Sequence, residues 1–362
     1  MKQLKELEAN RELQEVSLDQ WEKLLENIRD GIGKTNRLLK AYEGVSHFSA
    51  KTLDEASYLL KVHEERGAKV IGGGTDILRM VQQKYVPELP GVLIDIKTTP
   101  DLAYIKEETG TLKIGALTCL SDIATAELIR VKCSILADAA SVVGSPQVRN
   151  MATIAGSICQ DICCWYYRAD KNYYHCLRKG GMHCLAKEGA NRWMFSIFGT
   201  PDECECYATC QSDMAITLSA LSARIQTTQR TIPIEEFCVP VPPGNVLRAD
   251  ELIKEIQIPV LSPDTRTKYS KFSIRKCLDH PLISVACIAS DKEAKIVLGG
   301  VSIMPYRAKE AEDIIKEKKN IDYDSADKAG EVALRNSVPM SMNDWKVEVA
   351  KTLIRRTILA LT

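Results

Sequence analysis

The sequence lacks the features that would place the protein in a membrane or on a nucleic acid. Lys and Arg together number 48, as do Asp and Glu, so the formal net charge is zero. A balanced charge leaves no overall attraction to polyanions or to anionic lipid surfaces. No apolar run approaches the roughly 20 residues that a membrane-spanning helix needs. These absences favour a soluble globular protein.

The N-terminal segment also lacks the apolar core of a secretory signal peptide, since residues 1–16 are charged throughout. We therefore expect a cytoplasmic location, where thiols stay free or bind metal. Histidine is scarce, at five residues, and no Ser-His-Asp or Cys-His pair stands in a recognisable motif. Hydrolytic chemistry is accordingly not expected.

Cysteine, by contrast, is abundant and clustered. Of the 13 cysteines, eight fall between Cys159 and Cys210, in a segment with little periodicity that spans about 159–211. A long irregular segment inside a domain is expected to be functional, or to be held by something other than apolar packing. The segment is therefore the first candidate for a functional site.

Short strand-like and helix-like runs alternate in the remaining sequence. Residues 52–67, TLDEASYLLKVHEERG, predict a helix with Thr52 as its N-cap, and residues 68–74, AKVIGGG, predict a strand that ends in glycines. Residues 121–143 read as helix, and strand-like runs after about residue 258 are followed by helical ones. This order of elements predicts an α/β or α+β protein.

The glycines of VIGGGTDI, residues 70–77, follow the predicted strand directly. Glycine lets a backbone turn sharply and brings N–H groups close to an anion, so the loop could hold a pyrophosphate. It is not a P-loop, because no Gly-Lys-Ser/Thr follows, and it lacks the Gly-x-Gly-x-x-Gly spacing of a Rossmann loop. On its own, a tight structural turn explains the loop equally well.

Four later segments make the pattern specific: GALT at 115–118, VGSPQVRNMATIAGS at 143–157, SDMA at 212–215 and YSKFSIRKCLD at 269–279. With the glycine loop, their order resembles the FAD-binding subunit of the molybdenum hydroxylases, the group of xanthine dehydrogenase and carbon monoxide dehydrogenase relatives. The resemblance covers about residues 45–362. It implies an α+β fold, with a two-part FAD-binding domain of the vanillyl-alcohol-oxidase/PCMH type and a smaller α+β C-terminal domain.

Apolar residues at helical intervals predict a helical N-terminal extension at 1–43, outside the resemblance. For the rest of the chain we predict an FAD-binding domain at 44–235 with its insert at about 159–211, a linker at 236–257 and a C-terminal domain at 258–362, and the resemblance implies the FAD contacts. The predicted FAD-contacting residues are Val70, Ile71, Gly72, Gly73, Gly74, Thr75, Asp76, Ile77, Val143, Thr153, Ile154, Ala155, Gly156, Ser157, Asp213, Ile253 and Lys271. Lys271 would supply a cation near the flavin or the phosphates. Ala155 and Ser157 replace a Gly and an Asn that are usual in the family, so we expect FAD to bind with a changed affinity or potential.

The insert resembles that of the hydroxybenzoyl-CoA reductase-like branch, which carries a [4Fe-4S] cluster on four cysteines. The resemblance implies Cys164, Cys176, Cys184 and Cys206 as the ligands, with 11, 7 and 21 residues between them. Each iron of such a cluster takes a soft thiolate ligand. Metal binding would then supply folding energy to a segment without a core of its own.

The cysteine pattern also fits two further kinds of site. A structural zinc ion accepts four thiolates, or three with an imidazole, and His175 and His183 each precede a predicted ligand. Disulfides are a weaker alternative in a reducing compartment. Cys204 or Cys210 could take the place of Cys206.

As a subunit of this kind, the chain would relay electrons through FAD and a [4Fe-4S] cluster. A molybdopterin-binding large subunit and a small [2Fe-2S] subunit would be its partners, and an external carrier such as ferredoxin or NAD would exchange electrons with it. No side chain is predicted to be catalytic, because the flavin itself performs the electron chemistry. The alternatives are a stand-alone flavin oxidoreductase and a zinc-stabilised scaffold subunit.

Overall fold

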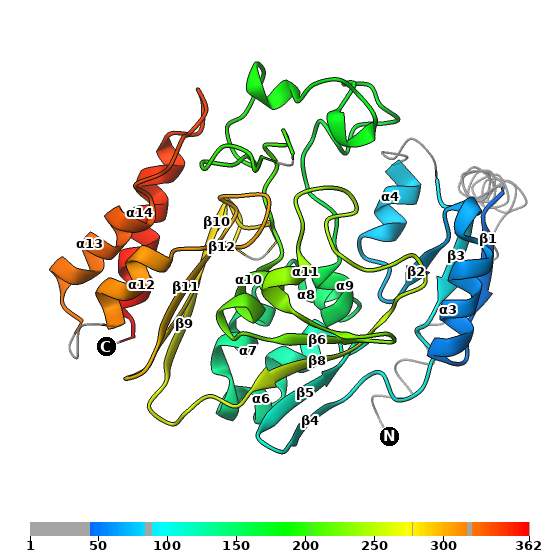
Figure 1. Cartoon of the computed structure of the whole chain (residues 1–362), viewed down its shortest axis with the longest axis horizontal. Coiled ribbons are helices and arrows are strands. Elements are labelled where there is room, and N and C mark those ends of the chain that lie inside the picture. Colours follow the sequence, from blue (N-terminus) through cyan, green and yellow to red (C-terminus); the bar gives the residue numbers. More distant parts are fainter. Residues whose placement is uncertain (1–43, 84–88, 203, 277, 317–320, 362) are drawn as a thin grey trace, which may run out of the picture. The chain divides into compact units, whose positions relative to one another are not determined.

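The structure is a computed structural model of the 362-residue chain, and it describes residues 44–83, 89–202, 204–276, 278–316 and 321–361. The predicted helical extension at 1–43 lies outside the described residues. From Ser46 onward the chain forms one unit, which is shown in Figure 1.

The first sheet is small and parallel, and it carries the glycine loop. Its strands are β1 (Ser46–Ser49), β3 (Val92–Asp95) and β2 (Lys69–Ile71), in that spatial order. Helix α3 (Leu53–Val62) packs on the sheet and η1 (Glu64–Arg66) follows it. The predicted N-cap is confirmed, because the Thr52 hydroxyl accepts a hydrogen bond of 3.1 Å from the Glu55 N–H. Beyond β2, the glycine loop leads into α4 (Ile77–Gln83).

The second sheet is antiparallel and encloses the largest apolar core together with a group of helices. Its strands run in the order β4 (Ile105–Glu108), β5 (Thr111–Gly115), β8 (Ile253–Pro259), β6 (Arg224–Thr227) and β7 (Thr231–Pro233). The helices are α5 (Leu120–Thr125), α6 (Glu127–Lys132), α7 (Ser134–Ser141), α8 (Pro146–Arg149), α9 (Ile154–Ile158), α10 (Asp213–Ala220) and α11 (Ile234–Phe237). The region predicted as helix at 121–143 is thus three helices. Strand β8 is central in this sheet and crosses the predicted boundary between residues 257 and 258.

The cysteine-rich insert forms the green segment at the top of Figure 1. Among its described residues, helical structure is limited to two single 3₁₀ turns, η2 (Leu177–Lys179) and η3 (Leu185–Lys187). It nevertheless has an apolar cluster of its own, in which Tyr167, Ala186 and Phe195 are buried among the thiols. The expected lack of periodicity is confirmed, whereas the segment is not without a core.

The C-terminal part is a four-stranded antiparallel sheet with helices on both faces. Its strands run in the order β12 (Tyr306–Arg307), β11 (Ala294–Gly299), β10 (Ile283–Ala289) and β9 (Arg266–Phe272). Figure 1 shows α12 (Lys309–Lys316), α13 (Tyr323–Ala333) and α14 (Trp345–Leu359) on one side of this sheet. On the other face, α7 and α10 contact the strands, so the sheet is shared with the first part of the chain. The predicted mixture of helices and sheets, an α+β architecture, is confirmed.

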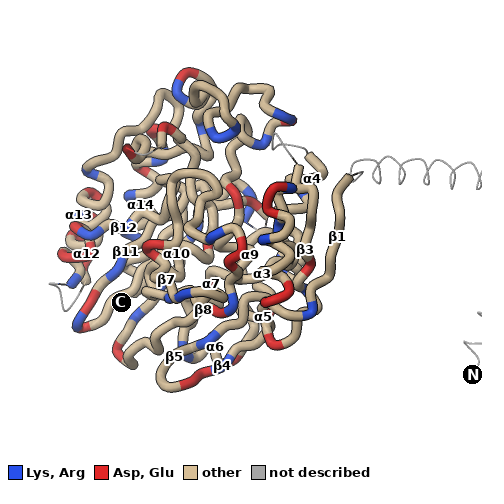
Figure 2. The backbone as a smooth tube through the Cα atoms, turned by 45° about the vertical axis from the view of Figure 1, so that its right-hand side comes forward, with Lys and Arg blue, Asp and Glu red and all other residues tan. Residues whose placement is uncertain are grey.

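Figure 2 shows that residues of both charge signs are interspersed along the described chain. This mixture agrees with the zero net charge of the sequence. Within the described residues, no helix combines the length and the apolar character that crossing a bilayer requires.

Candidate functional site

The glycine loop presents backbone donors that the rest of the structure leaves unused. It runs from Gly72 to Asp76, between β2 and α4, and Gly74 has a φ of +74° that only glycine adopts without strain. Among the described residues, no backbone carbonyl accepts a hydrogen bond from the N–H groups of Gly72, Gly73, Gly74 or Thr75. Successive N–H groups of this kind form a concave site for an anion such as a phosphate.

The second loop lies directly against the first. A Cβ atom at Gly73 would stand 1.8 Å from the carbonyl oxygen of Met151, and one at Gly72 would stand 3.5 Å from the hydroxyl of Thr153. Residue 73 must therefore be glycine for the two loops to approach so closely. The structure thus brings together two segments that are about 80 residues apart in the sequence, as the FAD-site prediction requires.

Thr153 shapes the second loop by capping α9. Its hydroxyl accepts a hydrogen bond of 3.1 Å from the N–H of Gly156. The N–H of Ala155 donates to the carbonyl of Ala116, so the residue that replaces a family glycine is part of the structural hydrogen bonding. Ser157 is different, because its hydroxyl is buried and has no hydrogen-bond partner among the described residues. Buried hydroxyls normally have a partner, so Ser157 is the residue of this loop whose hydrogen bonding the described residues leave incomplete.

Asp213 and Lys271 form a buried ion pair at the first turn of α10. Their charged atoms are 2.8 Å apart, and their side chains are 3% and 5% exposed. The Lys271 ammonium also donates to the carbonyl of Val142, and the Tyr269 hydroxyl donates to the other carboxylate oxygen of Asp213. Burial raises the pKa of Asp213, and the Lys271 cation opposes that rise. Lys271 is predicted as a cation for the cofactor, and in the structure the Asp213 carboxylate balances its charge. Val143, another predicted FAD contact, directly follows Val142, whose carbonyl accepts the hydrogen bond from Lys271.

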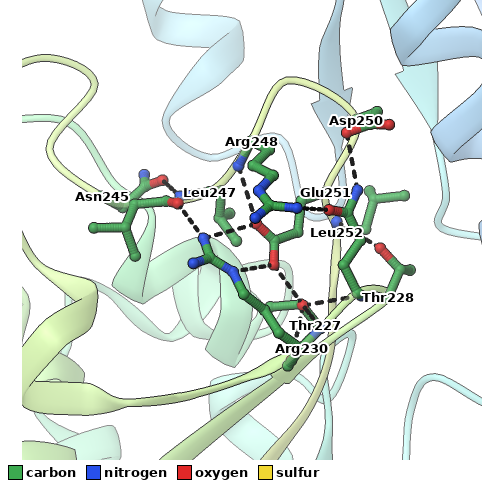
Figure 3. A network of polar contacts seen from close by, with 11 residues as sticks. Thr227, Thr228, Arg230, Asn245, Leu247, Arg248, Asp250, Glu251 and Leu252 are labelled. Carbon is green, nitrogen blue, oxygen red and sulfur yellow. Dashed lines mark hydrogen bonds and ion pairs between the residues drawn. The ribbon is translucent and has the colours of Figure 1, made fainter.

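Ile253 is buried at the start of β8, and the segment before it is fixed by Glu251. The Glu251 side chain is fully buried, accepts two hydrogen bonds from Arg230, and accepts one from the hydroxyl of Thr227. It also accepts from the backbone N–H of Arg248, and Figure 3 shows these contacts converging on the carboxylate. The predicted linker is thus bound to the turn between β6 and β7, which sets the position of Ile253.

Asp76 lies at the end of the glycine loop but its side chain points to the insert. One carboxylate oxygen is 2.8 Å from the guanidinium of Arg168, and the other accepts a hydrogen bond of 2.9 Å from the N–H of Asp161. The prediction grouped Asp76 with the FAD contacts. In the structure, the contacts of its carboxylate with described residues are to the insert.

The four cysteines predicted to bind the [4Fe-4S] cluster all belong to one group of packed apolar side chains in the insert. Cys164, Cys176 and Cys206 are buried, and Cys184 is half-buried and packs against them. Burial raises the pKa values of the first three, to about 12 for Cys206. Backbone N–H groups oppose this rise by bonding to the sulfur two or three residues earlier in the chain. The donors are Tyr166 and Tyr167 for Cys164, Arg178 for Cys176 and Ala208 for Cys206.

No group of three or more Cys, His, Asp or Glu side chains is arranged around a common metal-ion position within the described part of the chain. Ligands of a single zinc ion lie within roughly 4 Å of one another, given Zn–S bonds of about 2.3 Å. The thiols therefore share an apolar cluster that is not arranged around a single metal ion among the described residues.

Most of the other cysteines lie in or against the apolar cores. Cys133 and Cys287 are buried there, and burial raises the pKa of each to about 12. Cys159, Cys210 and Cys238 pack against the same core as Cys133. Cys204 belongs to the apolar cluster of the insert, so it stays a substitute for Cys206.

The second half of the insert is attached through residues that the sequence patterns did not single out. The ammonium of Lys346 donates to the carbonyls of Trp193, Phe195 and Gly300, at 3.0, 2.8 and 2.5 Å. The side-chain amide of Asn343 donates to the carbonyls of Phe195 and Ser196. One signal was available, because Lys346 precedes Ala350, Ile354 and Ile358 at intervals of four on the buried face of α14.

A small cavity of about 40 Å³ lies where the insert meets the start of α10 and the loop after α11. Arg178 and Gln211 line it, and the Arg178 Nε and the Gln211 Oε1 are buried without a partner among the described residues. The volume suits a few water molecules, which could bridge the two groups. Arg178 also donates a hydrogen bond of 2.6 Å to the carbonyl of Pro240, so it fastens the insert to this loop.

Comparison with known proteins agrees with this geometry. Residues 42–261 match the model of the FAD binding domain in molybdopterin dehydrogenase. The aldehyde oxidoreductase FAD-binding subunit PaoB of Escherichia coli K12 is 30% identical over 310 residues, which are 82% of this chain and 92% of that subunit. Subunit alpha of the 6-hydroxypseudooxynicotine dehydrogenase complex of Paenarthrobacter nicotinovorans is 25% identical over 328 residues, 86% of this chain and 93% of that subunit.

A solved structure shares the fold. It is the carbon monoxide dehydrogenase from Hydrogenophaga pseudoflava that lacks the Mo-pyranopterin moiety of the molybdenum cofactor. The match has a TM-score of 0.68 and 23% identity, and it covers 88% of this chain and 96% of that one. The family model spans more than half of the present chain, and the relative from Escherichia coli spans most of it. The chain therefore belongs to the family of FAD-binding subunits of molybdenum hydroxylases.

Proposed function

We propose that the chain binds FAD and a [4Fe-4S] cluster, and that it relays electrons within a molybdenum hydroxylase-type complex. The observation that carries the FAD site is the contact between the two glycine-bearing loops. At Gly73 this contact leaves no space for a Cβ atom, and the N–H groups of residues 72–75 donate to no backbone carbonyl among the described residues. FAD would supply electron chemistry there, and the predicted residues from Val70 to Ile77 and from Thr153 to Ser157 would hold its pyrophosphate.

Two properties of the insert support the cluster proposal. Cys164, Cys176, Cys184 and Cys206 lie in one apolar cluster, and backbone N–H groups beside three of them lower the pKa of the thiol against the effect of burial. Hydrogen bonds from N–H groups stabilise thiolates and tune the potential of iron–sulfur clusters. The arrangement favours Cys206 over Cys210, which packs against a different core. The layout is that of the hydroxybenzoyl-CoA reductase-like branch, to which we assign the chain within the family.

The remaining parts of the proposal follow from the family. The relatives named above are subunits of oxidoreductases. We infer a molybdopterin-binding large subunit and a small [2Fe-2S] subunit as partners, an external carrier such as ferredoxin or NAD, and a cytoplasmic location. The two-part FAD-binding domain would be of the vanillyl-alcohol-oxidase/PCMH type, ending at the linker 236–257.

Anaerobic preparation of the whole chain tests both cofactors. We expect bound FAD together with iron and acid-labile sulfide in equal amounts, about four of each per chain. Cys206→Ser should lose the iron and sulfide and keep the FAD, because its thiol lies outside the glycine loops. Cys204→Ser is the matched control and should keep all three.

The outcomes separate the two halves of the proposal. Stoichiometric zinc without sulfide would contradict the cluster and leave the flavin site untouched. Loss of iron in Cys204→Ser but not in Cys206→Ser would show that the ligand assignment is wrong. A chain that binds no FAD when FAD is supplied in excess would contradict the assignment of the glycine loops.

A further inference from the structure

The glycine loop and the cysteine insert are joined by Asp76. Its two carboxylate oxygens contact Arg168 at 2.8 Å and the N–H of Asp161 at 2.9 Å, and both of these residues are in the insert. The N–H groups of residues 72–75 in the same loop donate to no backbone carbonyl of the described residues, which leaves them for the proposed nucleotide. One short loop thus combines backbone donors for an anion with a last side chain that contacts the insert.

Arg168 belongs to a rigid turn that contains a predicted cluster ligand. Its guanidinium donates to the carbonyls of Ile162 and Asp161, at 2.7 and 2.9 Å, and its backbone N–H donates to the carbonyl of Cys164 at 2.8 Å. The neighbouring Tyr167 hydroxyl donates to the carboxylate of Asp161 at 2.5 Å. Residues 161–168 therefore form one hydrogen-bonded unit, and the position of Cys164 depends on where this unit is held.

The Asp76–Arg168 ion pair holds the unit of residues 161–168 against the glycine loop. The Arg168 side chain is only 8% exposed, and the Asp76 side chain is 30% exposed. Removing one partner would leave a largely buried guanidinium without its counter-charge, which is far more costly than the loss of a surface pair. One turn after Asp76, Met80 of α4 packs against the apolar cluster of the insert, so a second contact follows the ion pair.

We propose that the Asp76–Arg168 ion pair couples nucleotide binding at the glycine loop to the ordering of residues 161–180 of the insert. Arg168 is in this sense a positioning residue for the cysteines, not a contact of the cofactor. The inference rests on the proposed FAD site. When a nucleotide fixes the loop, the Asp76 carboxylate is fixed as well, and the turn that carries Cys164 gains a rigid partner. Coupling of this kind is reciprocal, so loosening the insert must weaken nucleotide binding by the same factor.

Hydrogen–deuterium exchange of the whole chain, with and without added FAD, tests the coupling and needs no iron. In the unmodified protein, FAD should slow exchange in residues 70–83 and also in residues 161–180. In Arg168→Gln and in Asp76→Asn, FAD should slow exchange only in residues 70–83. Lys187→Gln removes an exposed cation of the same insert and should behave like the unmodified protein.

Titration with FAD provides the reciprocal measurement. Arg168→Gln should weaken FAD binding roughly tenfold, which is within the usual range for coupled sites, whereas Lys187→Gln should leave it unchanged. If FAD slows exchange in residues 70–83 of the unmodified protein but not in residues 161–180, the coupling is overturned and the FAD site stands. If FAD slows exchange in neither segment, the FAD site itself is overturned. Unchanged FAD affinity in Arg168→Gln would also contradict the coupling.

Discussion

At the scale of single residues, the candidate FAD site depends on the absence of a side chain at one position of the glycine loop. Gly73 lies where any Cβ atom would collide with the backbone of Met151. The collision would be with a carbonyl oxygen, which cannot rotate away as the end of a flexible side chain can. Gly72 differs, since the nearest atom to its Cβ position is the end of the Leu117 side chain at 3.3 Å.

We therefore expect Gly73→Ala to separate the two loops and to abolish FAD binding, with a lower temperature of thermal unfolding. Gly72→Ala is the matched control and should retain FAD, because Leu117 can shift by a few tenths of an ångström. The ratio of FAD to protein after gel filtration is the measurement. Equal FAD retention by the two variants would show that close packing of the loops is not required.

His280 provides a second prediction at this scale, on the pH dependence of stability. Burial lowers the pKa of its imidazole to about 4, and the cations Arg168, Lys271 and Arg79 add to the effect. In the unfolded chain the pKa is about 6.5. Between these two values the unfolded state binds more protons, so the free energy of unfolding should fall as the pH falls from about 6.5 to about 4.

The contribution amounts to up to about 3 kcal/mol, at about 1.4 kcal/mol for each pKa unit. Urea unfolding at several pH values should therefore show a smaller decline in His280→Gln than in the unmodified protein. Asp213, whose pKa is raised, acts in the opposite direction at low pH, and comparing the two proteins removes that background. Identical pH profiles would show that His280 is not held in its neutral form.

At the scale of elements, the insert is held at two ends by different parts of the chain. Its first half is tied to the glycine loop through Asp76, and its second half is tied to the segment that opens α14. Lys346 supplies two of the hydrogen bonds at the second end, to the carbonyls of Trp193 and Phe195, and a third to the carbonyl of Gly300, from a side chain with no exposed surface. Hydrogen bonds and ion pairs with the rest of the chain therefore hold both halves of this segment.

Lys346→Met should destabilise the protein by at least about 2 kcal/mol, because it leaves buried carbonyls without their donor. Lys351→Met, on the same helix, removes a more exposed pair with Glu331 and should cost less than about 1 kcal/mol. Chemical unfolding measures both, and limited proteolysis should cut residues 190–198 faster in Lys346→Met only. Equal stabilities would show that α14 does not anchor the insert.

At the scale of the whole described unit, the Asp213–Lys271 pair joins parts that the chain builds separately. Asp213 begins α10, which packs in the first core, and Lys271 lies in β9 of the C-terminal sheet. Because α10 also contacts β10 and β11, one helix is shared by both parts. The unit should unfold in one transition rather than as two independent domains.

Lys271→Met should cost about 3–5 kcal/mol, since it leaves the buried Asp213 carboxylate without a counter-charge. Arg335→Met, which breaks an exposed pair with Glu310, should cost less than about 1 kcal/mol. The double variant Asp213→Asn/Lys271→Met should be less destabilised than the sum of the single variants. Additive costs would show that the two side chains do not act as a pair.

The local sequence alone determined the kind of protein and the places of its loops. Thr52 and the glycines after β2 act through the backbone of their own neighbourhood, so the cap and the turn can be read without knowing any partner. The order of the motifs resembles that of the family, and the clustered cysteines mark the insert. Both are features of the sequence itself and require no knowledge of which residues meet in the fold. Lys271 shows the limit of such reading, because its charge was predicted for the cofactor and is neutralised by Asp213.

Only the tertiary structure decided which groups pair. Asp76 meets Arg168 across 92 residues of sequence, Lys271 meets Asp213 across 58, and Lys346 meets Phe195 across 151. A buried charge needs a partner of opposite charge or a set of hydrogen bonds. The sequence alone does not show which residue supplies it. That choice depends on how the sheets and the insert pack together, which is a property of the folded chain as a whole.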